Sequence, residues 1–205
     1  MNELDFAALL VSRVCHDLVS PVGAVVNGLE VLEDERDAAM RADAIKLVTS
    51  SAELAAARLQ FARIAYGAAG SAGAELDLTE VGRIVCGLVK GSKVDVDWQA
   101  AHVNWPKDWA KLLMNATLLA ADSLQRGGRI KVETSLDPGA PSFTVRAAGQ
   151  GARILEEAEK AVRGEPSGPL DGRSIQPYLT HKLARSLNAG LTVTSRDGVI
   201  ELIAG

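Results

Sequence analysis

The stretch that decides the fold is Arg13-Val14-Cys15-His16-Asp17-Leu18-Val19-Ser20-Pro21, where a histidine and a carboxylate are adjacent inside a helical pattern. From Leu4 to Leu32, apolar residues recur at spacings of three and four, which predicts one long amphipathic helix. The stripe is predicted to run through Val11, Val14, Leu18, Val22, Val25, Leu29 and Leu32. It takes two successive steps of four near Pro21, which predicts a stutter. Because proline lacks an N–H and crowds the carbonyl of Asp17, we expect a bend there.

His16 is predicted to lie on the helix face away from this stripe. With Val11 at position a of a heptad, His16 takes position f, and Ser20, Gly23 and Asn27 share its face at i+4, i+7 and i+11. These small or polar residues leave room for another molecule to approach. Histidine is the side chain most often used to move protons and phosphoryl groups near neutral pH. We therefore predict that His16 is an exposed nucleophile.

Four neighbours of His16 are candidates for a docking surface: Val19, Ser20, Gly23 and Asn27. For Ser20, Gly23 and Asn27 the alternative is an ordinary solvated helix face, and the sequence favours neither. For Val19 the alternative is a place on the flank of the helical bundle. Asp17 is a candidate for orienting or tuning the imidazole, with a plain surface carboxylate as the alternative.

A second long helix is predicted from about Ala38 to Tyr66, after a charged break. Its apolar residues Met40, Leu47, Leu54 and Phe61 repeat every seven positions and are expected in the core. Two helices joined by a short turn form an antiparallel hairpin. Because one hairpin cannot cover two apolar stripes, we expect a homodimer that closes a four-helix bundle.

Composition narrows the class of protein. The chain has 205 residues and a formal net charge of -4, which argues against nucleic acid as a partner. Two cysteines are too few for a disulfide framework or a structural zinc site. The acidic N-terminus is unlike a signal peptide, and no apolar run is expected to reach the span of a bilayer, so no membrane partner is predicted. A cytoplasmic protein is expected.

The chain is predicted to divide into two domains, residues 1–70 and 75–205. The stretch Gly67–Ala74 is rich in glycine and alanine and is typical of a linker. Beyond it, strand patterns alternate with helical ones, which indicates a two-layer α/β sandwich. The expected helices are 78–89, 106–125, 154–163 and 175–187, and the expected strands are 94–98, 129–136, 142–147, 191–195 and 199–203. The whole chain is therefore predicted to be α+β.

This arrangement resembles the histidine-kinase core, with His16–Pro21 similar to its H-box. The resemblance implies a dimerisation and phosphotransfer hairpin followed by an ATPase-like (Bergerat) domain. The nucleotide motifs depart from the kinase pattern, however. Where kinases carry Asn-x-x-x-Asn-x-x-Lys, this chain has Lys111, Asn115 and Leu118. Ala147 replaces the aspartate that reads adenine.

The glycine-rich phosphate loop of kinases is also missing, since Arg173–Pro177 stands in its place. A phosphate cradle needs glycines so that backbone N–H groups can converge on the anion. An adenine pocket without its carboxylate leaves a buried donor unpaired, at a cost of roughly 1–3 kcal/mol. The second domain is therefore expected to be a degenerate ATPase-like domain that binds no nucleotide.

An intact histidine beside a degenerate nucleotide site resembles the ChpT-type histidine phosphotransferases of bacterial phosphorelays. The resemblance implies that His16 accepts a phosphoryl group from the receiver aspartate of a CckA-type hybrid kinase and passes it to response regulators of the CtrA and CpdR type. It also implies that this chain binds no cofactor and that Mg²⁺ comes with the receiver domain. Two other hypotheses stay open: a divergent ATP-dependent sensor histidine kinase, and a non-catalytic scaffold or inhibitor that docks on a kinase.

Overall fold

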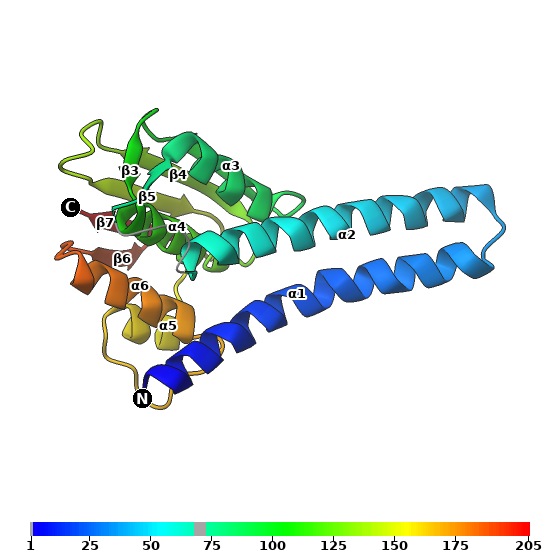
Figure 1. Cartoon of the computed structure of the whole chain (residues 1–205), viewed down its shortest axis with the longest axis horizontal. Helices are drawn as coiled ribbons and strands as arrows, with labels where there is room; N and C mark the ends of the chain where they lie inside the picture. Colours follow the sequence, from blue (N-terminus) through cyan, green and yellow to red (C-terminus); the bar gives the residue numbers. More distant parts are fainter. Residues whose placement is uncertain (1, 68–72) are drawn as a thin grey trace.

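The computed structural model describes residues 2–67 and 73–205, and most of the predicted linker lies outside them. Two long helices, α1 (Glu3–Asp34) and α2 (Ala38–Ala65), form an antiparallel hairpin that projects from the rest of the molecule (Figure 1). Asn2 and Asp5 form a capping box at the start of α1, and Asp37 caps α2. Both predicted helices are confirmed.

The remaining chain forms a mixed five-stranded sheet in the order β2-β4-β5-β7-β6, covered by helices. β2 pairs with β4 in parallel, and the other neighbours pair antiparallel. Its strands are β2 (Val94–Gln99), β4 (Gly128–Thr134), β5 (Phe143–Ala148), β6 (Thr192–Arg196) and β7 (Val199–Ala204). The helices are α3 (Leu78–Val89), α4 (Lys107–Asp122), α5 (Glu156–Val162) and α6 (Ile175–Ser186).

One face of this sheet is buried and the other is solvated, which makes the sandwich two-layered. In β4, β5 and β7 buried residues alternate with more exposed ones, because successive side chains point to opposite faces. Figure 1 shows α4 against the sheet, and ten of its sixteen residues are buried. The predicted α+β class is therefore confirmed.

Sequence reasoning missed two short strands, β1 (Glu75–Asp77) and β3 (Asn104–Pro106), which pair antiparallel with each other. Three residues are too few to show a period of two. The helix predicted to reach Gln125 ends at Asp122, and the hydroxyl of Ser123 donates back to the carbonyl of Leu119.

The packed line between α1 and α2 differs from the predicted stripe. Along α1 the buried residues are Pro21 and Gly28, whereas Val22 and Leu29 are 49% and 48% exposed. A Cβ on Gly28 would lie 2.6 Å from a methyl group of Val48, so the small residue lets the two helices approach closely. Pro21 and Gly28, together with the half-buried Val14, Leu18, Val25 and Leu32, form the face of α1 that packs on α2. These residues follow one another at alternating steps of four and three, which is an unbroken heptad spacing, so the predicted stutter is wrong.

The predicted core stripe of α2 is also only partly buried in the single chain. Phe61 is 3% exposed and Leu54 is half-buried, but Met40 and Leu47 are 55% and 45% exposed. Phe61 and Ala65 belong to the same hydrophobic cluster as the sheet, so the base of the hairpin packs on the sandwich. The division at residues 71–74 stays a prediction.

The expectation that no apolar run reaches the span of a bilayer is wrong for α1. This helix has an 18-residue window of mean hydropathy 1.5, and 6% of that window is buried. Among the described residues it is the one helix long and apolar enough to cross a membrane by length and composition. A single such helix near the N-terminus is weak evidence for a span.

Candidate functional site

His16 lies on the outer surface of α1, with 86% of its side chain exposed. Its Nδ1 atom is 3.3 Å from Oδ1 of Asp17, the next residue along the helix. A proton on Nδ1 can therefore be donated to the carboxylate, which leaves Nε2 with its lone pair toward solvent. The predicted exposure of His16 is confirmed.

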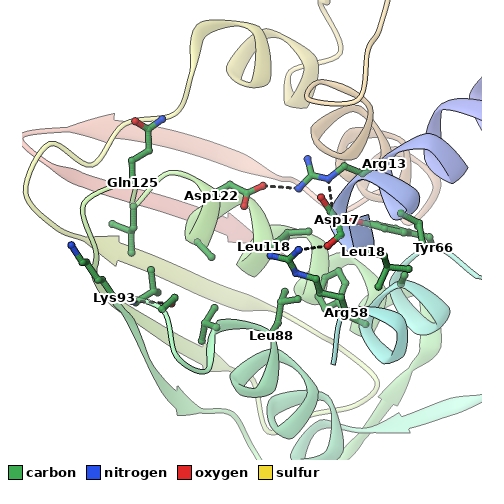
Figure 2. Close-up of a pocket in the computed structure, with 18 of the residues that line it drawn as sticks. Arg13, Asp17, Leu18, Arg58, Tyr66, Leu88, Lys93, Leu118, Asp122 and Gln125 are labelled. Carbon is green, nitrogen blue, oxygen red and sulfur yellow. Dashed lines mark hydrogen bonds and ion pairs between the residues drawn. The ribbon is translucent and has the colours of Figure 1, made fainter. Parts of the chain in front are cut away.

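The carboxylate of Asp17 is held from its other side by Arg13, one helical turn earlier. Nε of Arg13 donates to Oδ2 of Asp17 at 2.9 Å, and a terminal nitrogen of the same guanidinium donates to Asp122 at 3.1 Å (Figure 2). A third bond runs from Arg13 to the carbonyl of Gly172 at 3.3 Å. Arg13 is 14% exposed, so this fork is largely shielded from water. The arginine therefore joins α1 to the C-terminal end of α4 and to the loop before α6.

Pro21 leaves a free acceptor beside the histidine, and α2 supplies the donor. In a regular helix the carbonyl of Asp17 would accept the N–H of residue 21, but proline has none. A terminal nitrogen of Arg58 in α2 donates to this carbonyl instead (Figure 2). Asp17 is thus held by two arginines, Arg13 at its side chain and Arg58 at its backbone.

A pocket of about 360 Å³ opens below this network, between the hairpin and the sandwich. Arg13, Asp17 and Arg58 lie at one end and Lys93 and Gln125 at the other (Figure 2). Apolar side chains of both parts of the chain line the space between them, among them Leu18, Phe61, Leu88 and Leu118. The hairpin and the sandwich therefore face each other across a partly open, mixed-polarity groove.

The pocket walls perturb its ionisable groups. Burial raises the pKa of Asp122, although the side chain keeps 48% of its own surface open, and the charge of Arg13 works against that rise. Burial opposes the charge on Arg13, but Asp122 and Asp17 outweigh it and raise the pKa of Arg13. Burial also raises the pKa of the Tyr66 hydroxyl. The raised pKa of Arg13 keeps its guanidinium charged near neutral pH.

The predicted docking residues lie beside His16 as the helical spacing requires. Val19 is 71% exposed, and Ser20 and Asn27 are exposed as well. Gly23 is half-buried, but a Cβ placed there would meet nothing within 4 Å. The structure thus keeps this side of α1 open around the histidine.

The position that matches the central kinase asparagine is used inside the protein. Asn115 is 0% exposed, and its amide nitrogen donates to the carbonyls of Ala65 and Lys111 at 3.2 and 2.9 Å. Its side-chain oxygen accepts from Gln176 at 3.0 Å. Gln176 is also fully buried and donates to the backbone carbonyl of Asn115 at 2.9 Å. Asn115 therefore joins α2, α4 and α6 and presents no free ligand atom.

The other two degenerate positions are structural as well. Ala147 is a fully buried residue of β5, paired with Ile130 and Ile200 on its neighbours. Ahead of α6, one carboxylate oxygen of Asp171 accepts from the N–H of Arg173 and from the N–H and hydroxyl of Ser174. A closed turn thus occupies the place of the glycine-rich phosphate loop. Among residues 2–67 and 73–205, no group of three or more His, Cys, Asp or Glu side chains could hold a metal.

Sequence reasoning missed three residues of the network that holds Asp17: Arg13 and Arg58, which bind Asp17, and Asp122, which binds Arg13. The spacing of four between Arg13 and Asp17 was a readable signal for a helical ion pair. Asp122 is 109 positions from Arg13, and Arg58 is 41 positions from Asp17. No local pattern links residues so far apart.

Comparison with known proteins shows the family of the chain. The sequence model of the family described as "Histidine phosphotransferase C-terminal domain" matches residues 78–198. The chain is 40% identical over 195 residues to the protein phosphotransferase ChpT of Brucella abortus (strain 2308), covering 95% of this chain and 91% of that protein.

Solved structures include a similar fold along the whole chain. The structure described as "1.7 Angstrom Structure of a Bacterial Phosphotransferase" matches with a TM-score of 0.90 and 35% identity, over 100% of this chain and 98% of the other. A weaker likeness, with a TM-score of 0.48 and 18% identity over 89% of this chain and 95% of the other, is to the histidine kinase domain of a blue-light activated kinase from Erythrobacter litoralis.

A helical hairpin with an outward histidine, joined to an α/β sandwich, is thus the architecture of a phosphotransferase, as these two relatives show. The chain belongs to the histidine phosphotransferase family.

Proposed function

We propose that His16 is the phosphoacceptor of this phosphotransferase. The observation that carries the proposal is the pairing of an 86% exposed imidazole with a carboxylate on Nδ1 alone. This arrangement leaves Nε2 as a nucleophile that a second protein can reach. The neighbouring surface is open, so a folded domain can approach without displacing a side chain of the core.

The reaction proceeds by in-line transfer between two proteins. Nε2 of His16 attacks the phosphorus of an acyl phosphate on the donor's aspartate, the N–P bond forms, and the P–O bond to the aspartate breaks. The aspartate leaves as a carboxylate. The phosphorylated ring carries a positive charge with its proton on Nδ1, and Asp17 stabilises that charge. Attack by the aspartate of a second partner reverses these bonds and frees His16. Because such transition states are loose, catalysis depends mainly on positioning and charge.

The partners proposed here are receiver domains, of a CckA-type hybrid kinase upstream and of CtrA- and CpdR-type regulators downstream. Mg²⁺ would come with the receiver and not from this chain. Val19, Ser20, Gly23 and Asn27 are proposed as the docking surface, with exposed Val19 as its apolar contact. Single substitutions to alanine at these positions should weaken receiver binding. Replacing His16 should instead abolish phosphoryl transfer and leave receiver binding intact.

We also propose that two copies of the chain form a four-helix bundle through their hairpins. Support comes from the apolar residues that the single chain leaves open on both helices: Val22 and Leu29 on α1, and Met40 and Leu47 on α2. They recur at sevens, as the seam of a bundle does. Sedimentation should give twice the chain mass, and Leu29→Glu should give the monomer. A monomeric wild type at micromolar concentration would refute the bundle.

The proposal includes no nucleotide. Both polar groups of the Asn115 side chain are hydrogen-bonded inside the protein, the nitrogen to the carbonyls of Ala65 and Lys111 and the oxygen to Gln176, and a closed turn replaces the phosphate loop. Thermal unfolding with and without ATP and magnesium should give the same midpoint, since a ligand that binds only the folded state would raise it. We place the protein in the cytoplasm, because receiver domains work there and His16 must meet them.

One transfer experiment tests the central claim. A receiver domain labelled from radioactive acetyl phosphate is mixed with wild-type protein or with His16→Gln, and label on this chain is followed in the absence of ATP. Label should appear on the wild type only and should be acid-labile. Label on His16→Gln would overturn the proposal. Label that appears only with ATP would identify a divergent kinase, and a stable unlabelled complex would identify a docking scaffold.

A further inference from the structure

The fork of Arg13 connects the reactive surface of α1 to the C-terminal part of the chain. Arg13 contacts Asp17 on its own helix, Asp122 at the end of α4 and the carbonyl of Gly172 before α6. A guanidinium is planar and presents its donors in a fixed geometry, so three acceptors from three segments define its orientation. The side chain is 14% exposed, and water cannot readily replace these contacts.

The two oxygens of the Asp17 carboxylate have different partners. Oδ2 accepts from Arg13 at 2.9 Å, and Oδ1 lies 3.3 Å from Nδ1 of His16. Arg13 therefore sets the rotation of the carboxylate, and the carboxylate sets which ring nitrogen of His16 keeps the proton. His16 is too exposed for packing to orient it, so the chain from Asp122 through Arg13 and Asp17 is the constraint on its ring.

We propose that Arg13 is a positioning residue for phosphoryl transfer, which holds Asp17 against Nδ1 of His16, and that Asp122 anchors Arg13 for this task. The inference rests on the proposed role of His16. It assigns a function to the degenerate C-terminal domain, which holds the Arg13 side chain in place through Asp122 and does not contact the phosphoryl group. A lysine at position 13 would keep the charge but could not span Asp17 and Asp122 together.

The reactivity of His16 can be measured without a protein partner, using phosphoramidate as a small phosphodonor. Nε2 forms a bond to phosphorus and ammonia leaves, so the rate reports the ring and not receiver docking. The full-length wild type is compared with Arg13→Met, Arg13→Lys, Asp122→Asn and the double variant Arg13→Met/Asp122→Asn. Arg83→Met is the matched control, because Arg83 makes an exposed ion pair with Glu80 far along the chain.

We expect Arg13→Met to slow phosphorylation by about tenfold, with little rescue in Arg13→Lys. Asp122→Asn should slow it less, and the double variant should match Arg13→Met, since Asp122 acts through Arg13. The control should react at the wild-type rate. Two-bond ¹H–¹⁵N spectra of the imidazole should show the Nδ1–H tautomer in the wild type and a shift toward Nε2–H in Arg13→Met.

Three results would overturn the inference: an unchanged rate in Arg13→Met, a slower rate with an unchanged tautomer, or additive effects in the double variant. The second would mean that Arg13 only stabilises the fold, which circular dichroism of the same samples would show. Phosphorylation of His16→Gln at the wild-type rate would instead refute the role of His16 itself, so the two failures are distinguishable.

Discussion

Replacing Asn115 tests whether this position is a structural residue or a remnant of a nucleotide site. Its side chain makes three buried hydrogen bonds, two donated to the carbonyls of Ala65 and Lys111 and one accepted from Gln176. A net contribution of about 1 kcal/mol per bond, with a further 1–3 kcal/mol for buried groups left unpaired, predicts a loss of about 4–6 kcal/mol for Asn115→Ala. Asn115→Asp should lose more stability, because a buried carboxylate cannot donate to the carbonyls of Ala65 and Lys111 and its negative charge is repelled by both oxygens.

The assay is urea unfolding of both variants and the wild type at one protein concentration, since association would shift the midpoints. Gln60→Ala, at an exposed position of α2, is the control and should stay within about 0.5 kcal/mol of the wild type. A loss below about 1 kcal/mol for Asn115→Ala would refute the structural role. An Asn115→Asp protein as stable as the wild type, and stabilised further by ATP with magnesium, would show that the position still faces a ligand site.

Two further predictions concern single positions. Gly28→Ala should destabilise the hairpin by about 1–2 kcal/mol, because overpacking against Val48 outweighs the gain in helix propensity. Gly23→Ala, whose added methyl group meets nothing within 4 Å, should instead stabilise it by up to about 1 kcal/mol. Equal shifts of the melting temperature in the two variants would contradict the close approach of α1 and α2. Hydrogen bonds from Ser174 lower the pKa of Asp171 below its usual 3.8, so its contribution is present above that value and is lost as the pH falls through the folded-state pKa. Because Asp171 is exposed and water screens its charge, Asp171→Ala should cost at most about 1 kcal/mol at pH 7, and the gap to the wild type should close in acid unfolding curves; a gap that does not depend on pH would refute this assignment.

Much of the fold follows from local sequence patterns. The sequence predicted α1, α2, the hairpin β6–β7 and the strands of the main sheet to within a few residues. This was possible because the helical and strand periods depend only on residues a few positions apart. The outward direction of His16 followed from the same period. The loss of the kinase motifs at Lys111, Ala147 and Arg173–Pro177 could also be read directly from the residue types.

The tertiary structure decided which apolar residues pack within one chain. The sequence favoured Val22 and Leu29 as seam residues because they are large and apolar, but Pro21 and Gly28 are the buried ones. The reason is steric, since the distance between two helices depends on the smallest residue at their contact, which hydrophobic spacing does not report. Val22 and Leu29 therefore remain exposed in the single chain, and they form part of the surface on which the proposed second copy packs.

The sequence by itself determined a long helix with an exposed His16 and a sandwich without nucleotide motifs. Only the tertiary structure decided how Asp17 is held, by Arg13 with Asp122 behind it and by Arg58 from the neighbouring helix. Helical and strand periods arise from interactions over a few residues, whereas these bonds join positions that folding alone brings together. Pro21 illustrates both: the sequence shows that its N–H is missing, but only the structure shows that Arg58 of α2 donates to the carbonyl of Asp17 in its place.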